Sequence, residues 1–259
     1  MDATTTAVKS ADRALLVLEY LASVPTPRGL ADIADALTIP RSSLHGLLRT
    51  MQNRGWLSTD DLDGGLHYRI GPQALTVGAS YLQSDDIFRR TTPLLDAISL
   101  ELGETIHLGE LQNGEVMYLE KRDARHSLRL VSGVGMRLPA YATALGKMLL
   151  SELDDAALSA RLAAPRPVLT PKTLVDEKML RDDLAATAAR GYAIDDEEST
   201  EGVRCFSFPI GAERPHRYAI SCSVPVARLD RVREAHIIEV MGKAAADFSE
   251  PSGIGVLQR

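Results

Sequence analysis

The stretch from Arg41 to Asn53 places hydrogen-bonding side chains opposite an apolar stripe. Four apolar residues recur there at the spacing of a buried helix face, namely Leu44, Leu47, Leu48 and Met51. The opposite side carries polar and basic residues, namely Arg41, Ser42, Ser43, His45 and Arg49. An arginine can make two hydrogen bonds to a phosphate or a guanine edge, and serine hydroxyls can contact phosphates or base edges. These residue types at this spacing indicate a helix that contacts DNA.

The charge distribution around this helix favours a nucleic-acid contact. The chain has a formal net charge of -6, which argues against a surface covered with DNA-binding charge. Residues 36–59 nevertheless contain no acidic residue and include Arg41, Arg49 and Arg54. A polar helix face taken alone is more often an ordinary solvated surface, so the DNA interpretation depends on this basic stretch and on the neighbouring elements.

The segments on either side have the pattern of a helix-turn-helix followed by a wing. Apolar spacing predicts two short helices before the polar one, over residues 11–22 and 30–37. Residues 55–71 then predict two short strands around the turn Asp63-Gly64-Gly65. His67 and Arg69 on the second strand are further candidates for DNA contact, although either could simply lie on an exposed strand.

A second group of residues could bind a small anion. Ser221 and Ser223 are two positions apart on an apolar strand, so their hydroxyls point to the same face. Thr143 and Ala144 open a predicted helix, whose first backbone N–H groups and positive dipole end suit a carboxylate. Two further polar residues belong to neighbouring predicted strands, Cys205 within one and Asp195 at the end of another.

Each residue of this second group also has a structural explanation. A single buried serine usually satisfies a nearby carbonyl, and a lone cysteine is usually a small core residue. The acidic run at residues 195–198 is more often a solvated loop than a metal site. The anion-binding hypothesis therefore rests on the combination and not on any single side chain.

An enzyme is the rival class of function. Cys205 could act as a nucleophile with His107 or His216 as its base, in a cysteine-dependent hydrolase of a small carboxylate-containing substrate. The sequence shows no glycine-rich oxyanion loop and no nucleophile signature around Cys205. The six histidines are scattered, and none forms a close metal-ligand pair. We therefore expect a protein that is not an enzyme and has no metal and no cofactor.

The elements that must position these residues fall into two domains joined by a helix. We expect a DNA-binding domain over residues 1–71, a linker helix over 72–90 and a larger domain over 91–259. In the larger domain the patterns predict strands at 105–111, 115–121, 126–131, 192–195, 203–210 and 217–226. One helix is predicted to start near Thr92 and to end at Gly103. Further helices are predicted at 142–152, 154–162, 175–190 and 228–248. This pattern predicts an α+β fold with a largely antiparallel sheet.

Composition agrees with a two-domain globular protein. The chain has 259 residues, of which 45% are hydrophobic, and no apolar stretch is long enough for a membrane helix. The amino terminus does not have the pattern of a secretory signal, so we expect a cytoplasmic protein without membrane contact. Its two cysteines, Cys205 and Cys222, are then expected to be reduced thiols.

The chain resembles the isocitrate-lyase-regulator (IclR) family of bacterial transcription factors over nearly its whole length. The amino-terminal markers are SADRALLVLEYLA, IPRSSLHGLLRTMQNRGWL and YRIGPQALTVG, and the carboxy-terminal ones are LPAYATALGKMLL, RGYAIDDEESTEGVRCFSFPI and YAISCSVP. The resemblance implies a winged helix-turn-helix and a GAF-like α/β domain that binds small organic acids. The positions that match the family's pocket are Ala144 and Leu145 by backbone, Asp195, Cys205, Ser221 and Ser223 by side chain, and Leu128 and Leu130 as an apolar wall.

The expected partners are a second copy of the chain, operator DNA and a small acid. One recognition helix covers only a few base pairs, so we expect a homodimer on palindromic double-stranded operator DNA, with the helix over 72–90 as the interface. A dimer of dimers is a further alternative. The effector is expected to be a small organic carboxylate, from an α-keto acid to a hydroxybenzoate-like aromatic acid. Whether the effector releases DNA or helps polymerase to bind stays open, because the family contains both.

Overall fold

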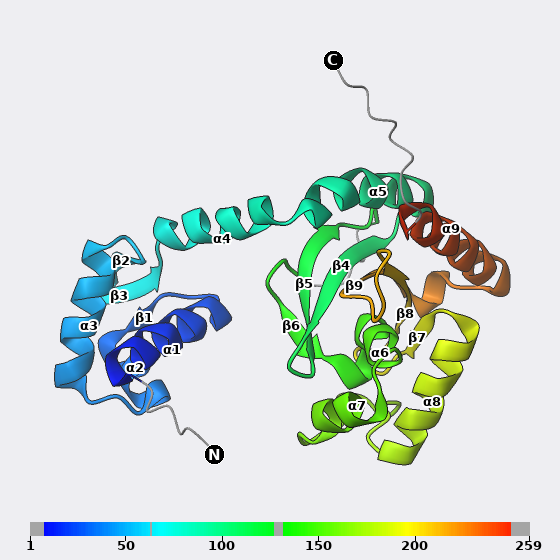
Figure 1. The fold of residues 1–259 in the computed structure, drawn as a ribbon. Helices are drawn as coiled ribbons and strands as arrows, with labels where there is room; N and C mark the ends of the chain where they lie inside the picture. Colours follow the sequence, from blue (N-terminus) through cyan, green and yellow to red (C-terminus); the bar gives the residue numbers. More distant parts are fainter. Residues whose placement is uncertain (1–7, 63, 127–131, 250–259) are drawn as a thin grey trace. The chain divides into compact units, whose positions relative to one another are not determined.

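The chain folds into two compact units. The computed structural model describes residues 8–62, 64–126 and 132–249, and residue contacts divide the chain at Asp86, with 1–86 in one unit and 87–259 in the other (Figure 1). Each unit has hydrophobic core residues of its own. Among the described residues, no helix combines the length and the apolar character needed to cross a membrane.

The first unit is the predicted winged helix-turn-helix. Its elements are α1 (Lys9–Ser23), β1 (Arg28–Gly29), α2 (Leu30–Leu37), α3 (Arg41–Asn53), β2 (Leu57–Leu62), β3 (Gly65–Ile70) and α4 (Pro72–Ser84). The turn between α2 and α3 contains Thr38 in a left-handed conformation (φ 53°). Fully buried apolar residues from three helices form the core, among them Val17, Ile33, Leu44 and Leu48. The sheet has the order β1-β3-β2, and the two-residue strand β1 was not predicted.

The prediction of a single linker helix over 72–90 is wrong, because two helices occupy this segment. α4 ends at Ser84, Asp85 has extended backbone angles (φ -113°, ψ 124°), and α5 (Asp86–Leu102) begins directly after it. Consecutive aspartates favour helix starts over helix interiors, which is the physical reason for the break. The helix expected from near Thr92 is the second half of α5, which continues through Pro93.

The second unit contains a six-stranded antiparallel sheet in the order β6-β5-β4-β9-β8-β7. Its strands are β4 (Thr105–Gln112), β5 (Glu115–Arg122), β6 (Arg137–Pro139), β7 (Ala193–Asp196), β8 (Val203–Ile210) and β9 (Tyr218–Pro225). β9 joins the two halves, because it pairs with β4 on one side and with β8 on the other. The predicted Asn113-Gly114 turn connects β4 and β5, with φ angles of 52° and 88°.

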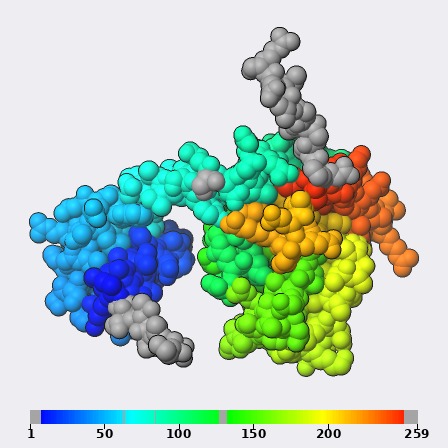
Figure 2. All heavy atoms as spheres, viewed as in Figure 1, coloured from blue at the N-terminus to red at the C-terminus, as the bar shows by residue number. Residues whose placement is uncertain are grey.

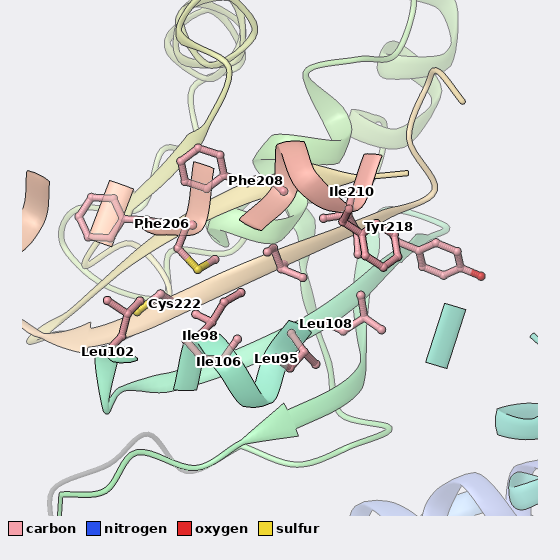
Figure 3. Packing of buried hydrophobic residues seen from close by; sticks show 14 of the residues in the cluster. Leu95, Ile98, Leu102, Ile106, Leu108, Phe206, Phe208, Ile210, Tyr218 and Cys222 are labelled. Carbon is pink, nitrogen blue, oxygen red and sulfur yellow. The ribbon is translucent and has the colours of Figure 1, made fainter. Parts of the chain in front are cut away.

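Helices cover the two faces of this sheet. α5 and α9 (Arg231–Ser249) pack on one face against alternating residues such as Ile106, Phe206 and Cys222 (Figure 3). The other face packs against η1 (Ala140–Ala142), α6 (Ala144–Leu150), α7 (Asp155–Leu162) and α8 (Glu177–Arg190). A short 3₁₀ turn, η2 (Val226–Arg228), follows β9. Alternation along each strand therefore separates an apolar core from a second, more polar face.

The structure agrees with most of the predicted elements in the second unit and corrects two. The predicted strand and helix positions agree with β4, β5, β7, β8, β9, α7, α8 and α9 to within a few residues. The helix predicted over 142–152 is the 3₁₀ turn η1 followed by the shorter α6, and β6 was not predicted. Of the strand predicted at 126–131, His126 lies in a bend, and the other residues fall outside the described residues.

Candidate functional site

The polar face of α3 is exposed as the sequence pattern predicted. Leu44, Leu48 and Met51 are buried, whereas the predicted DNA-contacting residues of this helix are all exposed, namely Arg41, Ser42, Ser43, His45 and Arg49. Space-filling atoms coloured for α3 and the wing form a surface of the first unit at the left of Figure 2. Arg41 lies 3.8 Å from Asp35 in an exposed ion pair, and such a pair is weak enough for a phosphate to replace it.

The two predicted wing residues are more constrained than those of α3. Arg69 Nε donates to Asp60 Oδ2 on the neighbouring strand at 2.9 Å, although its side chain stays 54% exposed. His67 is half-buried, and its Nδ1 lies 3.1 Å from the Gly65 carbonyl oxygen. Both belong to β3, next to the wing turn. They can reach a neighbouring ligand only by giving up or sharing these contacts.

In the second unit, strand register brings distant polar residues into rows on the face opposite α5 and α9. Thr105 on β4 pairs with Ser223 on β9, which pairs with Cys205 on β8, which in turn pairs with Asp195 on β7. One row further along, His107 pairs with Ser221, which pairs with Ser207. These rows assemble side chains that are separated by more than a hundred residues of sequence.

A cavity lies over these rows. Its volume is about 70 Å³, and it is partly open to solvent. All predicted effector-binding residues that the structure describes line it: Ala144, Leu145, Asp195, Cys205, Ser221 and Ser223. Leu128 and Leu130 lie outside the described residues. Thr143, which the sequence analysis placed at the start of the helix, also lines the cavity. The lining residues that the sequence analysis did not select are Tyr118, Ser132, Met136, Leu138, Ser199 and Thr200.

The start of α6 is held over the cavity by two glycines. A Cβ atom on Gly146 would lie 2.2 Å from the Ala140 carbonyl oxygen, so only glycine allows η1 to pack against α6. A Cβ atom on Gly109 would lie 2.8 Å from Val116 and 3.0 Å from Leu145, so this glycine leaves room for Leu145. The Thr143 hydroxyl caps the helix by accepting from the Gly146 N–H at 3.1 Å.

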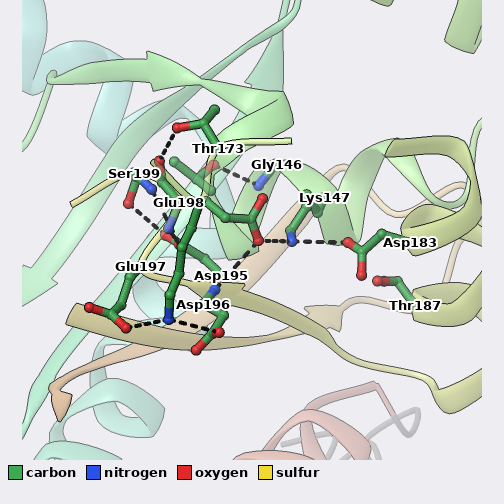
Figure 4. Close-up of polar contacts among 12 residues, drawn as sticks. Gly146, Lys147, Thr173, Asp183, Thr187, Asp195, Asp196, Glu197, Glu198 and Ser199 are labelled. Atoms are coloured by element: carbon green, nitrogen blue, oxygen red, sulfur yellow. Dashed lines mark hydrogen bonds and ion pairs between the residues drawn. The ribbon is translucent and has the colours of Figure 1, made fainter. Parts of the chain in front are cut away.

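A buried ion cluster holds the turn after β7 against α6 and α8 (Figure 4). Lys147 is 1% exposed, and its Nζ lies 2.5 Å from Glu198 Oε1 and 2.9 Å from Asp183 Oδ2. Burial raises the pKa of Glu198, and the Lys147 ammonium opposes that shift. Because removing one partner would leave uncompensated buried charge, the cluster fixes this turn at one wall of the cavity.

Asp195 organises the same turn with its carboxylate. Its Oδ1 accepts from the backbone N–H groups of Glu198 and Ser199, and its Oδ2 accepts from the Ser199 hydroxyl at 2.6 Å. Burial raises the pKa of Asp195, while these hydrogen bonds and Lys147 oppose the rise. Asp195 therefore lines the cavity with both oxygens already bonded to the turn.

The contacts of Cys205 do not match those of an activated nucleophile. Its Sγ lies 3.2 Å from the Ser223 hydroxyl, and burial together with nearby Asp195 raises the thiol pKa well above its usual value. His216 contacts Glu152 and the Gly211 carbonyl, and His107 contacts Ser132. Within the described residues, neither proposed base has a hydrogen bond to Cys205, so the hydrolase hypothesis gains no support from this geometry.

His107, which the sequence analysis considered only as a candidate base for Cys205, has a different place in the structure. It is fully buried, stacks on Tyr118 with 4.3 Å between ring centroids, and its Nε2 lies 2.8 Å from the Ser132 hydroxyl. Burial, aided by Lys121, lowers its pKa to about 3. The alternation of Thr105, His107 and Gly109 with apolar residues along β4 could have placed it on the polar face. In the described part of the chain, no group of His, Cys, Asp and Glu side chains is arranged to hold a metal ion.

Comparisons with known proteins cover both units. The IclR helix-turn-helix domain model matches residues 10–61, and the model for the bacterial transcriptional regulator IclR C-terminal domain matches residues 79–250. HTH-type transcriptional regulator XynR of Escherichia coli is 33% identical over 248 residues, covering 95% of this chain and 98% of its own. Transcriptional repressor IclR of Escherichia coli is 34% identical over 233 residues, covering 88% and 84%.

A solved structure has the same fold. The crystal structure of an IclR homolog from Microbacterium hydrocarbonoxydans, complexed with 4-hydroxybenzoate, superposes with a TM-score of 0.79 at 23% identity. The match covers 93% of this chain and 97% of that one. At this level of identity the likeness concerns the fold.

His107 gives a testable pH dependence of stability. The unfolded chain takes up a proton on this histidine near pH 6.5, whereas the folded chain does not do so until about pH 3. The free energy of unfolding should therefore fall as the pH drops below 6.5, by up to about 1.4 kcal/mol per pH unit from this residue. Urea unfolding at pH 7, 6 and 5 should show a shallower decline for His107→Phe, which keeps a ring on Tyr118 but cannot titrate. Parallel declines in the two proteins would contradict the assignment.

Proposed function

The chain belongs to the IclR family of bacterial transcriptional regulators, and from this premise we propose that a small organic carboxylate bound in its second unit controls operator binding by its first. Its relatives are DNA-binding regulators, so catalysis is not needed to explain the chain. The single observation that carries the effector proposal is the convergence of Ser221, Ser223 and Cys205 on one cavity beneath the start of α6.

The chemistry of this cavity suits an acid. The two serine hydroxyls can donate to carboxylate oxygens, and the first backbone N–H groups of α6, at Ala144 and Leu145, have no partner inside the helix. Asp195 also lines the cavity, and donors from Glu198 and Ser199 offset part of the negative charge that would repel a bound carboxylate. Apolar lining from Met136 and Leu138, together with the Tyr118 ring, favours a small acid with some apolar surface. Leu128 and Leu130 remain predicted members of the apolar wall.

The exposed face of α3 is proposed to lie in the major groove. Arg41, Ser42, Ser43 and His45 occupy the first turns of α3, the part of a recognition helix that contacts base edges, while Arg49 lies further along. His67 and Arg69 are proposed to contact the DNA backbone from the wing.

We also propose that the chain binds a palindromic operator as a dimer formed through α4. Within α4, none of residues 72–83, whose burial is described, is buried, and the helix exposes Leu75, Val77 and Leu82, with 76%, 48% and 41% of their surfaces accessible. Leu75 and Leu82 are seven residues apart and therefore lie on the same side of the helix. An exposed apolar stripe of this kind suits a second copy of the same helix, and a dimer of dimers would add a further interface.

Substitutions on α3 should reduce DNA affinity. Arg41→Ala should cost about 1–3 kcal/mol at one operator position if it contacts a base, or weaken binding to all sequences and flatten the salt dependence if it contacts phosphate. His45→Ala should also weaken operator binding. Gel-shift titrations at several salt concentrations separate the two cases. Arg161→Ala in the second unit removes the same charge and serves as the control. Unchanged affinity in both α3 variants would mean that another face enters the groove.

The effector site is tested by a thermal-shift screen of small keto and aromatic acids, followed by calorimetry with the acids that stabilise the protein. Ser221→Ala combined with Ser223→Ala should weaken acid binding at least tenfold, because hydrogen bonds to a charged group contribute about 1.5–3 kcal/mol. DNA binding without effector should persist. Cys205→Ser should have a milder effect, since it keeps a hydrogen-bonding group of similar size.

Ser207→Ala is the matched control for this experiment. Ser207 lies on the same sheet face, but its hydroxyl donates to the Ile220 carbonyl oxygen and does not line the cavity. Its loss should leave acid affinity unchanged. Full acid affinity in the double serine variant would place the effector elsewhere, and turnover of the bound acid would revive the hydrolase hypothesis.

The dimer proposal predicts that the wild-type chain has the mass of a dimer in light scattering at micromolar concentration. Leu75→Glu with Leu82→Glu should shift it toward monomer, because the double change buries charge in an apolar interface. Thr76→Glu, on a different side of α4, should leave the dimer intact. A wild-type monomer that binds a single half-site tightly would contradict the proposal.

A further inference from the structure

Ser132 is fixed at the rim of the cavity by two residues of the sheet. Lys121 Nζ donates to the Ser132 carbonyl oxygen at 2.7 Å, and His107 Nε2 lies 2.8 Å from the Ser132 hydroxyl oxygen. Lys121 and His107 are register partners on β5 and β4. The Ser132 side chain lines the cavity that also contains Ser221 and Ser223. Ser132, which lies between β5 and β6, is thus held in place by two side chains of the sheet.

The protonation state and tautomer of His107 determine whether the Ser132 hydroxyl oxygen accepts or donates the hydrogen bond between them. The ring is fully buried, and its pKa of about 3 keeps it neutral, so one ring nitrogen carries a proton and the other does not. Nδ1 is buried and has no hydrogen-bond partner among the described residues. If the proton were on Nδ1, a buried N–H donor would be left without an acceptor, a situation that folded proteins almost always avoid. The proton therefore resides on Nε2, which donates to Ser132.

The consequence concerns the hydrogen of the Ser132 hydroxyl. Because the Ser132 oxygen accepts from His107, its own O–H does not point to that ring and is available to donate to a neighbouring oxygen. Ser221 is the partner of His107 on β9, and Ser132 contacts the His107 ring, so both serines adjoin this histidine and line the cavity. A ligand that fills the cavity can meet both groups at once.

We infer that Ser132, oriented by His107, donates a hydrogen bond to a second oxygen of the effector, so that the cavity selects hydroxy or keto acids over plain carboxylic acids. This inference rests on the proposed function of the same cavity and specifies its ligand class. Ser221 and Ser223 hold the carboxylate, and Ser132 recognises the second oxygen. His107 is a positioning residue, because it acts on the ligand only through Ser132.

The test compares ligands that differ only in the second oxygen. Calorimetry with the full-length protein measures the affinities for 4-hydroxybenzoate and benzoate, for 3-hydroxybenzoate and benzoate, and for pyruvate and propionate. The ratio within a pair reports selection of the second oxygen, and general damage to the cavity lowers both affinities without changing their ratio. For at least one pair, the wild-type protein should prefer the oxygenated acid by about tenfold, the order expected for one hydrogen bond in a buried site.

Four variants test whether the preference for the oxygenated acid depends on Ser132 and His107. Ser132→Ala should bring the ratio close to one while keeping the affinity for the plain acid. His107→Phe should also lower the ratio, whereas His107→Gln, whose amide N–H can replace the Nε2 donor, should restore most of it. Thr200→Val removes a different hydroxyl from the cavity lining and should keep the ratio.

The outcomes separate the inference from the proposed function. Acids that bind with no preference in the wild-type protein, or with a preference that persists in Ser132→Ala, would overturn the inference and leave the carboxylate-sensing function standing. Loss of the preference in Thr200→Val but not in Ser132→Ala would also overturn it. If no acid of the panel binds, both the inference and the proposed acid effector fail.

Discussion

The register of β9 at the centre of the sheet is the constraint on which the second unit depends. Along this strand, Ile220, Cys222 and Val224 face α5 and α9, whereas Ser221 and Ser223 face the cavity. A slip of one residue would exchange the two sets, burying hydroxyls in an apolar core and lining the cavity with aliphatic groups. Because β9 pairs with both β4 and β8, the same register also sets His107 beside Ser221 and Cys205 beside Ser223.

A second set of contacts is needed at the polar cavity, because the turn after β7, which is rich in carboxylates, forms one of its walls. Lys147 pairs with Glu198 of this turn and with Asp183 of α8, and backbone N–H groups bond the carboxylate of Asp195. These contacts offset part of the negative charge of the wall, and the serine hydroxyls are the side-chain donors for an incoming acid. Lys147 belongs to α6, so the helix that covers the cavity and the turn that closes it are positioned by the same buried ion cluster.

Local patterns were sufficient for the winged helix-turn-helix, for most strands and for the common face of Ser221 and Ser223, because helix and strand periodicities are properties of short segments. They were not sufficient for the role of His107, whose neighbours come from β5 and β9 and from Ser132. Sheet order is a non-local property, and β4 and β9 are more than a hundred residues apart in sequence. The break at Asp85 was missed for a different reason: the apolar positions continue across it, and only the paired aspartates mark a new helix start.

We propose that acid binding in the second unit and DNA binding in the first are energetically linked. The most direct measurement of this linkage uses a DNA sequence that this chain selects from a random pool. It determines the affinity for that DNA with and without a saturating acid, and the affinity for the acid with and without that DNA. Linkage requires both affinities to change by the same factor, and couplings of this kind are typically about 5- to 150-fold. We expect the two factors to be equal and different from one. An acid that binds in the cavity while the DNA affinity stays unchanged would contradict it.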